Sequence, residues 1–369
     1  MARQNSRVRE GTHFPAFDIH SPETNSTPSV AVSAPDPFRA LVKRLAGAYG
    51  PSGSEEQVRE LVRNEIKGFV DQVRADALGN LVALRRGSGS SRSTRKKVML
   101  AAHLDEIGVM VTFLDPRGFM RFGALGPVKP LTLLGARVQF ANGAIGILAR
   151  EEKGASQNEI QMEKMFMDVG AVSGESASIR VGDAACFAQE AVDVGQYITG
   201  KALHGRIGCA VLIETMRQLK RTPHEVYCVF TVQEEVGTRG AGAAAFAIQP
   251  DFAFVLDATA AQDVPGSNSS TIALGKGPAI KLKDRSMIAS PPARQALIQA
   301  AREARVSYQI EVTPRAGGDG APIQAARDGV PTGALAIPMR YMHTPSEMIA
   351  FEDAEDATKI LLTLLSKSV

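Results

Sequence analysis

The stretch VMLAAHLDEIGVMV, residues 98–111, decides the fold of this 369-residue chain. Its first five residues form an apolar run, which predicts a strand buried on both faces, as in a parallel sheet covered by helices. The run ends directly on His103 and Asp105. In a His-x-Asp pair the imidazole can bind a metal ion while the carboxylate orients the ring, although a polar turn after a strand is the alternative interpretation. The stretch therefore predicts an α/β protein with ligand-type side chains at a strand end.

Strands and helices alternate on both sides of this stretch. Ser54 stands where a helix N-cap belongs, and Glu55 and Glu56 follow in the first turn, where acidic side chains favour the positive end of a helix. Further strands are expected at 80–84, 109–113, 225–233, 251–257, 308–312 and 332–337, and helices at 38–48, 51–66, 209–220, 240–247, 293–304, 323–328 and 351–367. This alternation predicts a mostly parallel sheet flanked by helices.

The segment 114–199 has a different pattern. Short β-type runs at 137–140, 145–148, 166–169 and 185–188 are separated by glycines, which predicts a small inserted β-barrel or sandwich. We therefore expect a disordered N-terminal tail at 1–36, a main α/β domain at 37–113 and 200–369, and an inserted β-rich domain at 114–199. The inserted domain is expected to mediate self-association, because it is cut off from the main sheet.

Composition excludes several classes of protein. The chain is 44% hydrophobic and 22% charged, and 42 basic against 39 acidic residues leave a net charge of +3. No nucleic-acid partner is expected, because the short basic run RSTRKK (92–97) is interpreted as a solvated loop. No membrane segment is expected either, since no run of 18 apolar residues occurs. The first 36 residues lack the apolar centre of a signal peptide, and the three cysteines, Cys186, Cys209 and Cys228, have no CxxC spacing, so a cytoplasmic protein is expected.

Three further strand ends carry ligand-type residues. VFTVQEEVGTRGA (229–241) ends a strand with Glu234 and Glu235, two carboxylates that are costly to bury together unless a cation neutralises at least one. FAFVLDATA (252–260) contributes Asp257, and AIPMRYMHTPSEM (336–348) places His343 in a loop after a strand. Alone, each has an ordinary interpretation: a solvated glutamate pair, a capping aspartate and a surface histidine. Because strand ends of open α/β sheets meet at one edge, the set together predicts a hydrolytic site of the zinc type.

A glycine-rich loop adds a possible substrate surface. RAGGDGAPI (315–323) exposes backbone groups around Gly317, Gly318 and Asp319. Such a loop can line a cleft or bind an anion, so these three residues are the candidate substrate-binding residues.

Six stretches in this order resemble the TET-type aminopeptidases, the glutamyl or deblocking aminopeptidase family, some members of which carry the label endoglucanase. The resemblance covers roughly residue 37 to the C-terminus and rests on HLDEIGVMV, DVGA, TVQEEVGTRGA, LDATAAQDVPG, GGDGAPIQAARDGVPT and YMHTPSEM. It implies a zinc-peptidase α/β domain with an inserted dimerisation domain. It also implies peptide substrates, one or two zinc or cobalt ions per chain, and homo-oligomers built from dimers, commonly dodecamers.

The resemblance also implies a role for each site residue. His103 and Asp257 would hold one metal ion, and Glu235 and His343 the other. Asp105 would orient His103, and Glu234 would be the general base.

One motif departs from the family pattern. The family reads Ala-Leu-Asp-Asp/Asn-Arg where this chain reads ALHGRIG (202–208), so His204 stands in the place of the carboxylate that bridges two metal ions, and Gly205 replaces the next polar residue. A carboxylate offers two oxygens to metals about 3.5–4 Å apart, whereas a neutral imidazole offers one lone pair. Three outcomes follow: a single-metal site completed by His204, for example with Glu235 and His343; two weakly held metals; or a catalytically impaired homologue kept for binding or scaffolding. Glycoside hydrolysis, suggested by the family label alone, would need two carboxylates flanking a sugar bond and no metal.

Overall fold

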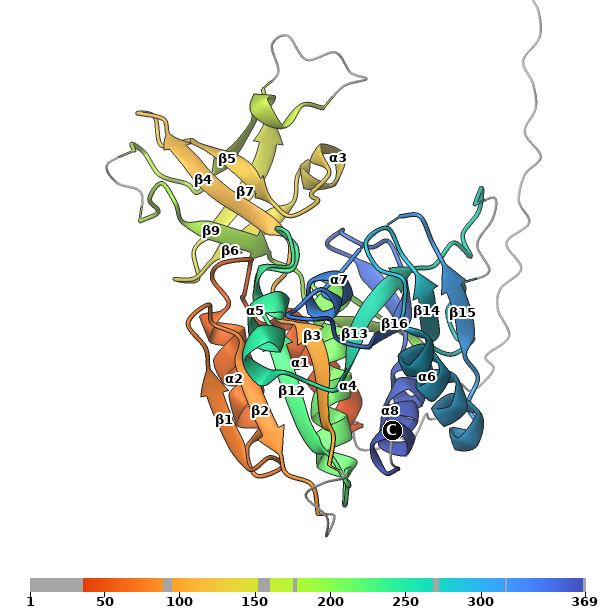
Figure 1. Ribbon diagram of the computed structural model, residues 1–369. Coiled ribbons are helices and arrows are strands. Elements are labelled where there is room, and N and C mark those ends of the chain that lie inside the picture. Colours follow the sequence, from red (N-terminus) through yellow and green to blue (C-terminus); the bar gives the residue numbers. More distant parts are fainter. Residues whose placement is uncertain are drawn as a thin grey trace, which may run out of the picture. The chain divides into compact units, whose positions relative to one another are not determined.

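The computed structural model describes residues 36–88, 95–151, 160–174, 178–267, 272–315 and 317–367 (Figure 1). The expected tail at 1–36, apart from Asp36, lies outside the described residues, and so does half of the basic run at 92–97. Helix α1 (Pro37–Gly47) begins directly after Asp36, whose carboxylate accepts hydrogen bonds from the backbone N–H groups of Phe38 and Arg39. This N-cap and the proline at the first helical position are a typical helix start.

The main domain is built on an 11-stranded sheet. The strand order is β1 (Gln72–Ala75), β2 (Leu81–Arg85), β12 (Glu225–Thr231), β3 (Lys97–His103), β13 (Phe252–Ala260), β16 (Thr332–Arg340), β17 (Glu347–Ala350), β11 (Tyr197–Gly200) and β10 (Val192–Val194), and β14 (Ala279–Lys283) pairs with both β16 and β15 (Gln309–Val312). The four central strands β12, β3, β13 and β16 are parallel, while the flanking pairs are antiparallel except β14 with β15. The expected parallel arrangement therefore holds for the strands that carry the candidate site, within a mixed sheet.

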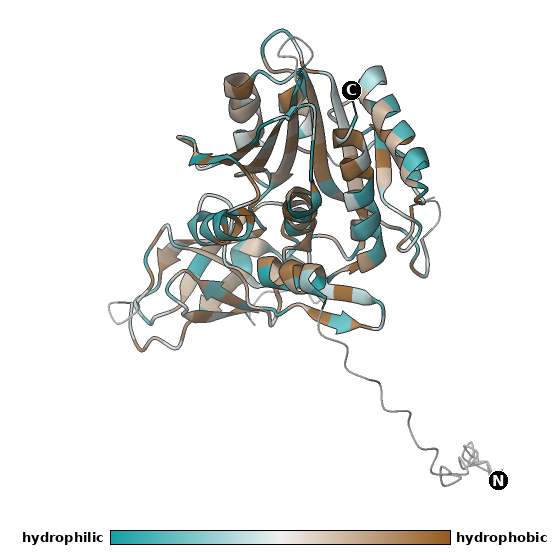
Figure 2. Ribbon diagram, turned by 90° about the horizontal axis from the view of Figure 1, so that it is seen from below, coloured by the Kyte–Doolittle hydropathy of each residue, from teal (hydrophilic) through white to brown (hydrophobic). Residues whose placement is uncertain are grey.

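Helices cover both faces of this sheet. Along β3, Val98, Leu100 and Ala102 belong to one apolar core and Met99 and Ala101 to another, because successive side chains of a strand point to opposite faces. The first core is completed by α1, α2 (Glu56–Ile66), α4 (Leu203–Gln218), α6 (Pro291–Ala304) and α8 (Phe351–Leu365), and the second by α5 (Arg239–Ile248) and α7 (Gly320–Gln324). Figure 2 shows apolar residues concentrated on the strands between these helices. Because helices cover both faces of β3, both sets of its side chains are buried, and its sequence is therefore an unbroken apolar run.

Most helix boundaries were predicted to within a few residues, but α4 (Leu203–Gln218) begins six residues before the expected 209–220, α7 (Gly320–Gln324) overlaps the expected 323–328 by only two residues, and the expected N-cap at Ser54 is wrong. Helix α2 begins at Glu56, and its N-cap position is Glu55, without a side-chain capping bond. The Glu55 carboxylate instead accepts hydrogen bonds from the N–H groups of Gly53 and Gln233, so it joins the helix start to the loop after β12.

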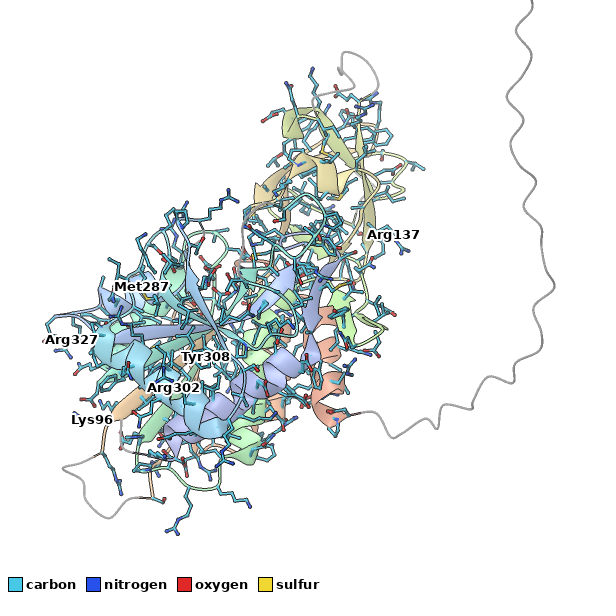
Figure 3. The ribbon with its side chains drawn as sticks, turned by 90° about the vertical axis from the view of Figure 1, so that its right-hand side faces the viewer. Lys96, Arg137, Met287, Arg302, Tyr308 and Arg327 are labelled. Carbon is cyan, nitrogen blue, oxygen red and sulfur yellow. The ribbon has the colours of Figure 1, made fainter. Side chains whose placement is uncertain are left out.

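The end of α6 is fixed by a side-chain contact. Arg302, in the last turn of α6, and Tyr308 lie side by side (Figure 3), and the Arg302 Nε donates to the Tyr308 hydroxyl at 3.4 Å.

The inserted domain is a closed six-stranded barrel in the order β4 (Gly108–Leu114), β5 (Met120–Leu125), β8 (Met165–Asp168), β7 (Ile145–Arg150), β6 (Arg137–Phe140) and β9 (Ala184–Phe187). It also contains α3 (Pro130–Leu133) and the short 3-10 helix η1 (Met162–Lys164). Val109 and Val111 of β4 face the barrel core, together with Phe122, Leu148 and Met167.

The barrel's strands differ from the expected boundaries of 114 and 199. Strand β4 belongs to the barrel, because the turn at Leu104–Ile107 redirects the chain after β3, while β10 and β11 belong to the main sheet. Within the described part of the chain, no helix is both long and apolar enough to cross a membrane.

Candidate active site

The carboxyl ends of the parallel strands bring the predicted residues together. His103 is the last residue of β3, and its strand partner Thr231 ends β12, three residues before Glu234. Asp257 lies near the end of β13, and His343 follows β16. A fifth element contributes His204, at the start of α4. The sheet therefore gathers residues that are up to 240 positions apart in the sequence, His103 to His343.

His103 is held at one ring nitrogen and free at the other. Its Nδ1 lies 3.1 Å from the backbone oxygen of Asp105 and 3.3 Å from its carboxylate. Its Nε2 is buried without a hydrogen-bond partner among the described residues and lies 3.8 Å from Asp257 Oδ1. Burial alone would lower the pKa of His103, but the hydrogen bond to Asp105 and the charge of Glu234 raise it well above its usual range. The Nε2 atom of this ring is thus directed into the cluster.

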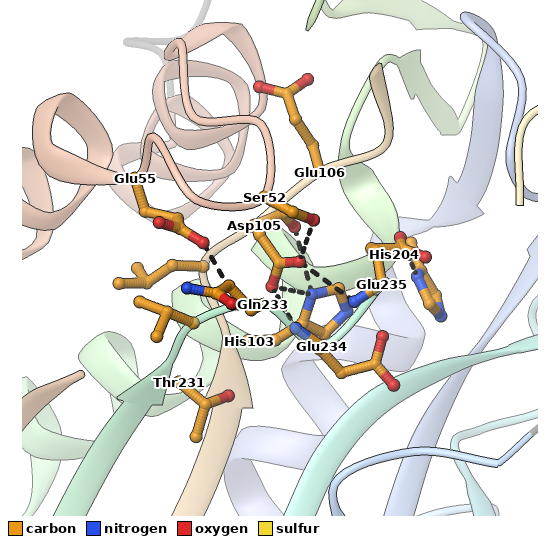
Figure 4. Close-up of polar contacts among 12 residues, drawn as sticks. Ser52, Glu55, His103, Asp105, Glu106, His204, Thr231, Gln233, Glu234 and Glu235 are labelled. Carbon is orange, nitrogen blue, oxygen red and sulfur yellow. Dashed lines mark hydrogen bonds and ion pairs between the residues drawn. The ribbon is translucent and has the colours of Figure 1, made fainter. Parts of the chain in front are cut away.

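Asp105 fixes the loops that carry the site (Figure 4). One of its oxygens accepts hydrogen bonds from the Ser52 hydroxyl at 2.6 Å and from the Glu235 N–H at 3.0 Å, and the other accepts the Glu234 N–H at 2.9 Å. The side chain is fully buried. Asp105 therefore orients His103 and the glutamate pair at once. Ser52 was not predicted, and only its place in the PSGSEE segment before α2 could have drawn attention to it.

The adjacent glutamates have different surroundings. Glu235 is within 2.9 Å of His204 Nδ1 and 3.4 Å of His343 Nε2. Burial would raise the pKa of Glu235, but His204 and His343 hold it well below its usual range. For Glu234, burial together with the neighbouring carboxylates of Asp257 and Asp319 raises the pKa well above its usual range, against the opposing charge of His103. Two carboxyl groups with separated pKa values are typical of acid–base sites.

His204 lies at the centre of the cluster. Its Nδ1 faces Glu235 Oε1 at 2.9 Å and its Nε2 faces Asp257 Oδ1 at 3.2 Å. Its ring centroid is 4.9 Å from that of His103 and 4.8 Å from that of His343, both in edge-to-face contact. The Glu347 carboxylate accepts the backbone N–H groups of His204 and His343 at 2.9 Å each, which fixes both histidines.

Gly205 is enclosed by His103. A Cβ atom at Gly205 would lie 2.5 Å from Cε1 and 2.6 Å from Nδ1 of the His103 ring, and 2.6 Å from the His103 carbonyl oxygen. The missing side chain at Gly205 therefore lets helix α4 approach β3 closely, and does not leave the site open.

A cavity of about 770 Å³ adjoins the cluster. Glu234, Glu235, Asp257, His204 and His343 line it, as do Gly317 and Gly318. A Cβ atom at Gly318 would lie 2.9 Å from Asp257 Oδ2, so this position admits little more than glycine.

Asp319 differs from the other candidate substrate-binding residues. It is only 2% exposed, it is not part of the cavity wall, and its Oδ2 accepts the Thr231 hydroxyl at 2.5 Å. Burial raises its pKa to about 7. Asp319 therefore supports the loop from behind the site.

Two groups of buried charges were missed by the sequence analysis. Lys281 and Glu311 are cross-strand neighbours on β14 and β15, line the cavity, and form an ion pair at 3.9 Å. Lys281 lies on β14, which is short and has no periodic pattern that would reveal it, whereas Glu311 lies on β15, within the expected strand at 308–312.

The second group is an ion cluster beneath the site. Lys201 binds Glu106 at 2.8 Å, and the Arg206 guanidinium lies 3.3 Å from the same carboxylate. Arg206 also donates to the backbone oxygens of Leu45 and Leu104. This cluster ties the start of α4 to the loops after α1 and β3.

The donor set fits a divalent cation. One ligand atom from each of His103, His204, Glu234 and Glu235 lies within 4.8 Å of the others. His103 Nε2 and His343 Nε2 are both buried and lack a hydrogen-bond partner among the described residues. Imidazole nitrogens and carboxylate oxygens are the ligands that zinc and similar metals take in hydrolytic sites.

Comparisons with known proteins agree with this chemistry. Residues 79–360 match the M42 glutamyl aminopeptidase family. A putative aminopeptidase of Acetivibrio thermocellus is 45% identical over 324 residues, which cover 87% of this chain and 96% of that protein. The structure of an aminopeptidase from the archaeon Desulfurococcus kamchatkensis superposes with a TM-score of 0.85 at 36% identity, covering 90% of this chain and 95% of that one. A TET1 peptidase of Pyrococcus horikoshii, which can assemble into a tetrahedron or a large octahedral shell, superposes with a TM-score of 0.78 at 29% identity, covering 89% and 99%.

Proposed function

We propose that this chain, which belongs to the M42 glutamyl aminopeptidase family and is a metal-dependent aminopeptidase, removes the N-terminal residue from short peptides with Glu234 as general base. The observation that carries the proposal is the contrast within the glutamate pair. Glu235 is engaged by two histidines, whereas Glu234 lies at the cavity wall with a raised pKa and with no histidine in ion-pair distance among the described residues.

The candidate metal ligands are His103, His204, Glu235, Asp257 and His343. When bound, a zinc or cobalt ion supplies Lewis-acid polarisation of the scissile carbonyl and activates water. Asp105 acts as a positioning residue, because its carboxylate holds the His103 ring and the backbone of both glutamates.

Glu234, which lines the cavity, is the proposed proton carrier. Its carboxylate takes the proton of the attacking water and delivers it to the leaving amine, and a positioned base of this kind commonly contributes about 10²–10⁴-fold in rate. Gly318 allows the peptide backbone to approach Asp257 and Glu234 closely, since a larger side chain there would collide with Asp257, while Gly317 lines the same cavity and packs against Ser286.

The test is Glu234→Gln, with Glu235→Gln as the matched control. Glu234→Gln keeps the shape of the side chain, so the protein should retain its metal ion while turnover of an amino-acid chromogenic amide falls by about 10²-fold or more. Glu235→Gln should weaken metal binding itself, because it removes the charge that fixes the His204 ring. Near-normal turnover by Glu234→Gln would rule out the base assignment.

The barrel is the proposed self-association domain. Along β7 the exposed Ile145 and Ile147 (44% and 51%) alternate with buried residues, which leaves an apolar stripe outside the barrel. We expect Ile145→Lys with Ile147→Lys to give smaller particles in sedimentation, whereas Phe246→Lys, at an exposed apolar residue of α5, should leave particle size unchanged. Particles of unchanged size in the barrel variant would contradict this role. A dimer-based assembly, up to a dodecamer, is the proposed state.

Two further proposals follow from the sequence. The three cysteines are buried and free, which fits a reducing compartment such as the cytoplasm. The alternative function, a catalytically impaired homologue that binds peptides, is favoured by His204 alone. Peptide binding by a metal-loaded protein without any turnover would support that alternative.

A further inference from the structure

We propose that this site holds one divalent cation, bound by His103, His204 and Asp257, and that it has no second site on the side of Glu235 and His343. The inference rests on the proposed metal-dependent function and concerns the number and place of the ions.

The direction of the His204 ring is the first argument. A carboxylate can only accept a hydrogen bond, so the 2.9 Å contact with Glu235 Oε1 makes His204 Nδ1 the donor. Nε2 lies 3.2 Å from Asp257 Oδ1, so in the metal-free protein it faces a second acceptor; a bound cation would take the place of the Nε2 proton, while Nδ1 keeps its bond to Glu235. Metal-binding histidines commonly donate their other N–H to a carboxylate in this way, because that contact fixes the ring.

His103 repeats the same arrangement. Its Nδ1 faces the backbone oxygen of Asp105 at 3.1 Å and therefore donates, which would leave Nε2 to bind a cation when the ring is neutral. That nitrogen is buried, has no hydrogen-bond partner among the described residues, and lies 3.8 Å from the same Asp257 oxygen. His103 Nε2 and His204 Nε2 therefore both face one Asp257 oxygen, where a cation would be held by all three residues. Two histidines and a carboxylate leave a position open for water and substrate, as catalytic zinc sites do.

The other half of the cluster lacks what a second ion needs. Oε1 of Glu235 accepts a hydrogen bond from His204 Nδ1 at 2.9 Å, whereas Oε2 lies 3.4 Å from His343 Nε2, which has no hydrogen-bond partner among the described residues. The His204 ring stands between the other two histidines, with centroids 4.9 and 4.8 Å away. Its single ring nitrogen facing Asp257 cannot join two ions, and the further carboxylate that lies within 4.8 Å of these ligand atoms among the described residues, Glu234, is the proposed general base. A second dication would therefore meet the first without a shared negative charge between them.

The decisive experiment counts metal ions in the full chain. The protein is stripped with a chelator, titrated with zinc or cobalt by calorimetry, desalted and analysed for metal. One tightly held ion per chain is expected. Two tightly held ions in the unmodified protein would overturn the inference, whatever the variants do.

A matched pair of histidine variants places the ion. His103→Ala and His343→Ala each remove a ring whose Nε2 is buried without a hydrogen bond. We expect His103→Ala to lower zinc affinity by about 100-fold or more, and His343→Ala to retain one ion per chain with affinity within about tenfold of the original. The reverse result would place the ion with Glu235 and contradict the inference.

His204→Asp provides a gain-of-binding test. The carboxylate supplies a second electron-pair donor atom and a negative charge, so the calorimetric stoichiometry should rise toward two, and a stoichiometry below one would contradict the role of His204 as described. Failure of the inference and failure of the proposed function are distinguishable. Two ions with peptide hydrolysis would refute only the single-ion site, whereas one tightly held ion without any hydrolysis would refute only the aminopeptidase activity.

Discussion

Gly205→Ala tests the packing of α4 against His103. The added Cβ would lie 2.5–2.6 Å from two ring atoms and the carbonyl oxygen of His103, whereas carbon atoms in contact normally stay about 3.5–4 Å apart. Relief of the overlap requires a displacement of about 1 Å, and overpacking of this kind typically costs about 1–3 kcal/mol. The carbonyl oxygen of His103 is part of strand β3 and cannot shift easily. The overlap is therefore relieved by movement of the His103 ring. A shift of this size in a catalytic group can lower turnover by about 10²-fold.

The assay compares Gly205→Ala with Gly47→Ala. Gly47 ends α1, and a Cβ there would meet no atom within 4 Å, so the same substitution should be neutral or stabilise by up to about 1 kcal/mol. Urea unfolding of the metal-free proteins measures stability, and calorimetry measures zinc affinity. Gly205→Ala should lower both the free energy of unfolding and the zinc affinity. If it unfolds at the wild-type midpoint and binds zinc with wild-type affinity, the close approach of α4 to His103 is refuted.

Three further predictions follow from buried polar groups. In Asp105→Asn one carboxylate oxygen is replaced by an NH2 group, so a single oxygen remains to accept the three hydrogen bonds that Asp105 now accepts. Zinc affinity and turnover should therefore each fall by about 10–100-fold, and unchanged values would refute the positioning role of Asp105. Arg206→Met leaves Glu106 with a single cation and several carbonyls without a donor, which should lower the free energy of unfolding by about 3 kcal/mol or more; a loss under 1 kcal/mol would contradict this. Burial, only partly offset by the Gly275 and Gly277 N–H groups, raises the pKa of Asp353 to about 6. Because this folded-state pKa lies above the unfolded value of about 4, ionisation destabilises the fold as the pH rises through this window. The stability of Asp353→Asn relative to the wild type should therefore rise by about 1–3 kcal/mol from pH 4 to pH 7, and a flat difference would refute the shift.

The site strands could be predicted because their sequence pattern is simple. Each ligand follows an apolar run, and parallel strands must end at one edge, so His103, Glu234, Glu235 and Asp257 could be grouped without a structure. The position of His204 was derived from the resemblance, because α4 is buried along most of its length and its sequence has no polar stripe that marks the start.

The sheet to which β4 belongs, strand β14 and the place of Asp319 depend on contacts between residues far apart in the sequence, which local sequence patterns do not reveal. The strand at Gly108–Leu114 follows β3 after only four residues, and sequence alone could not show that the turn between them leads into a different sheet. The short strand β14 has no distinct pattern, so Lys281 was not connected to the site. Asp319 was assigned to the substrate surface because glycines surround it, but its hydrogen bond to Thr231 turns it into the protein.

The central claim, a metal-dependent aminopeptidase, is tested most directly by one rate comparison. Two peptides of the same sequence, one with a free and one with an acetylated amino terminus, are offered to the chelated protein before and after zinc or cobalt is restored. We expect release of the N-terminal residue from the free peptide only after the metal is restored, and no cleavage of the acetylated peptide. Cleavage that persists in the chelated protein, equal cleavage of both peptides, or no cleavage under any metal condition would contradict the account.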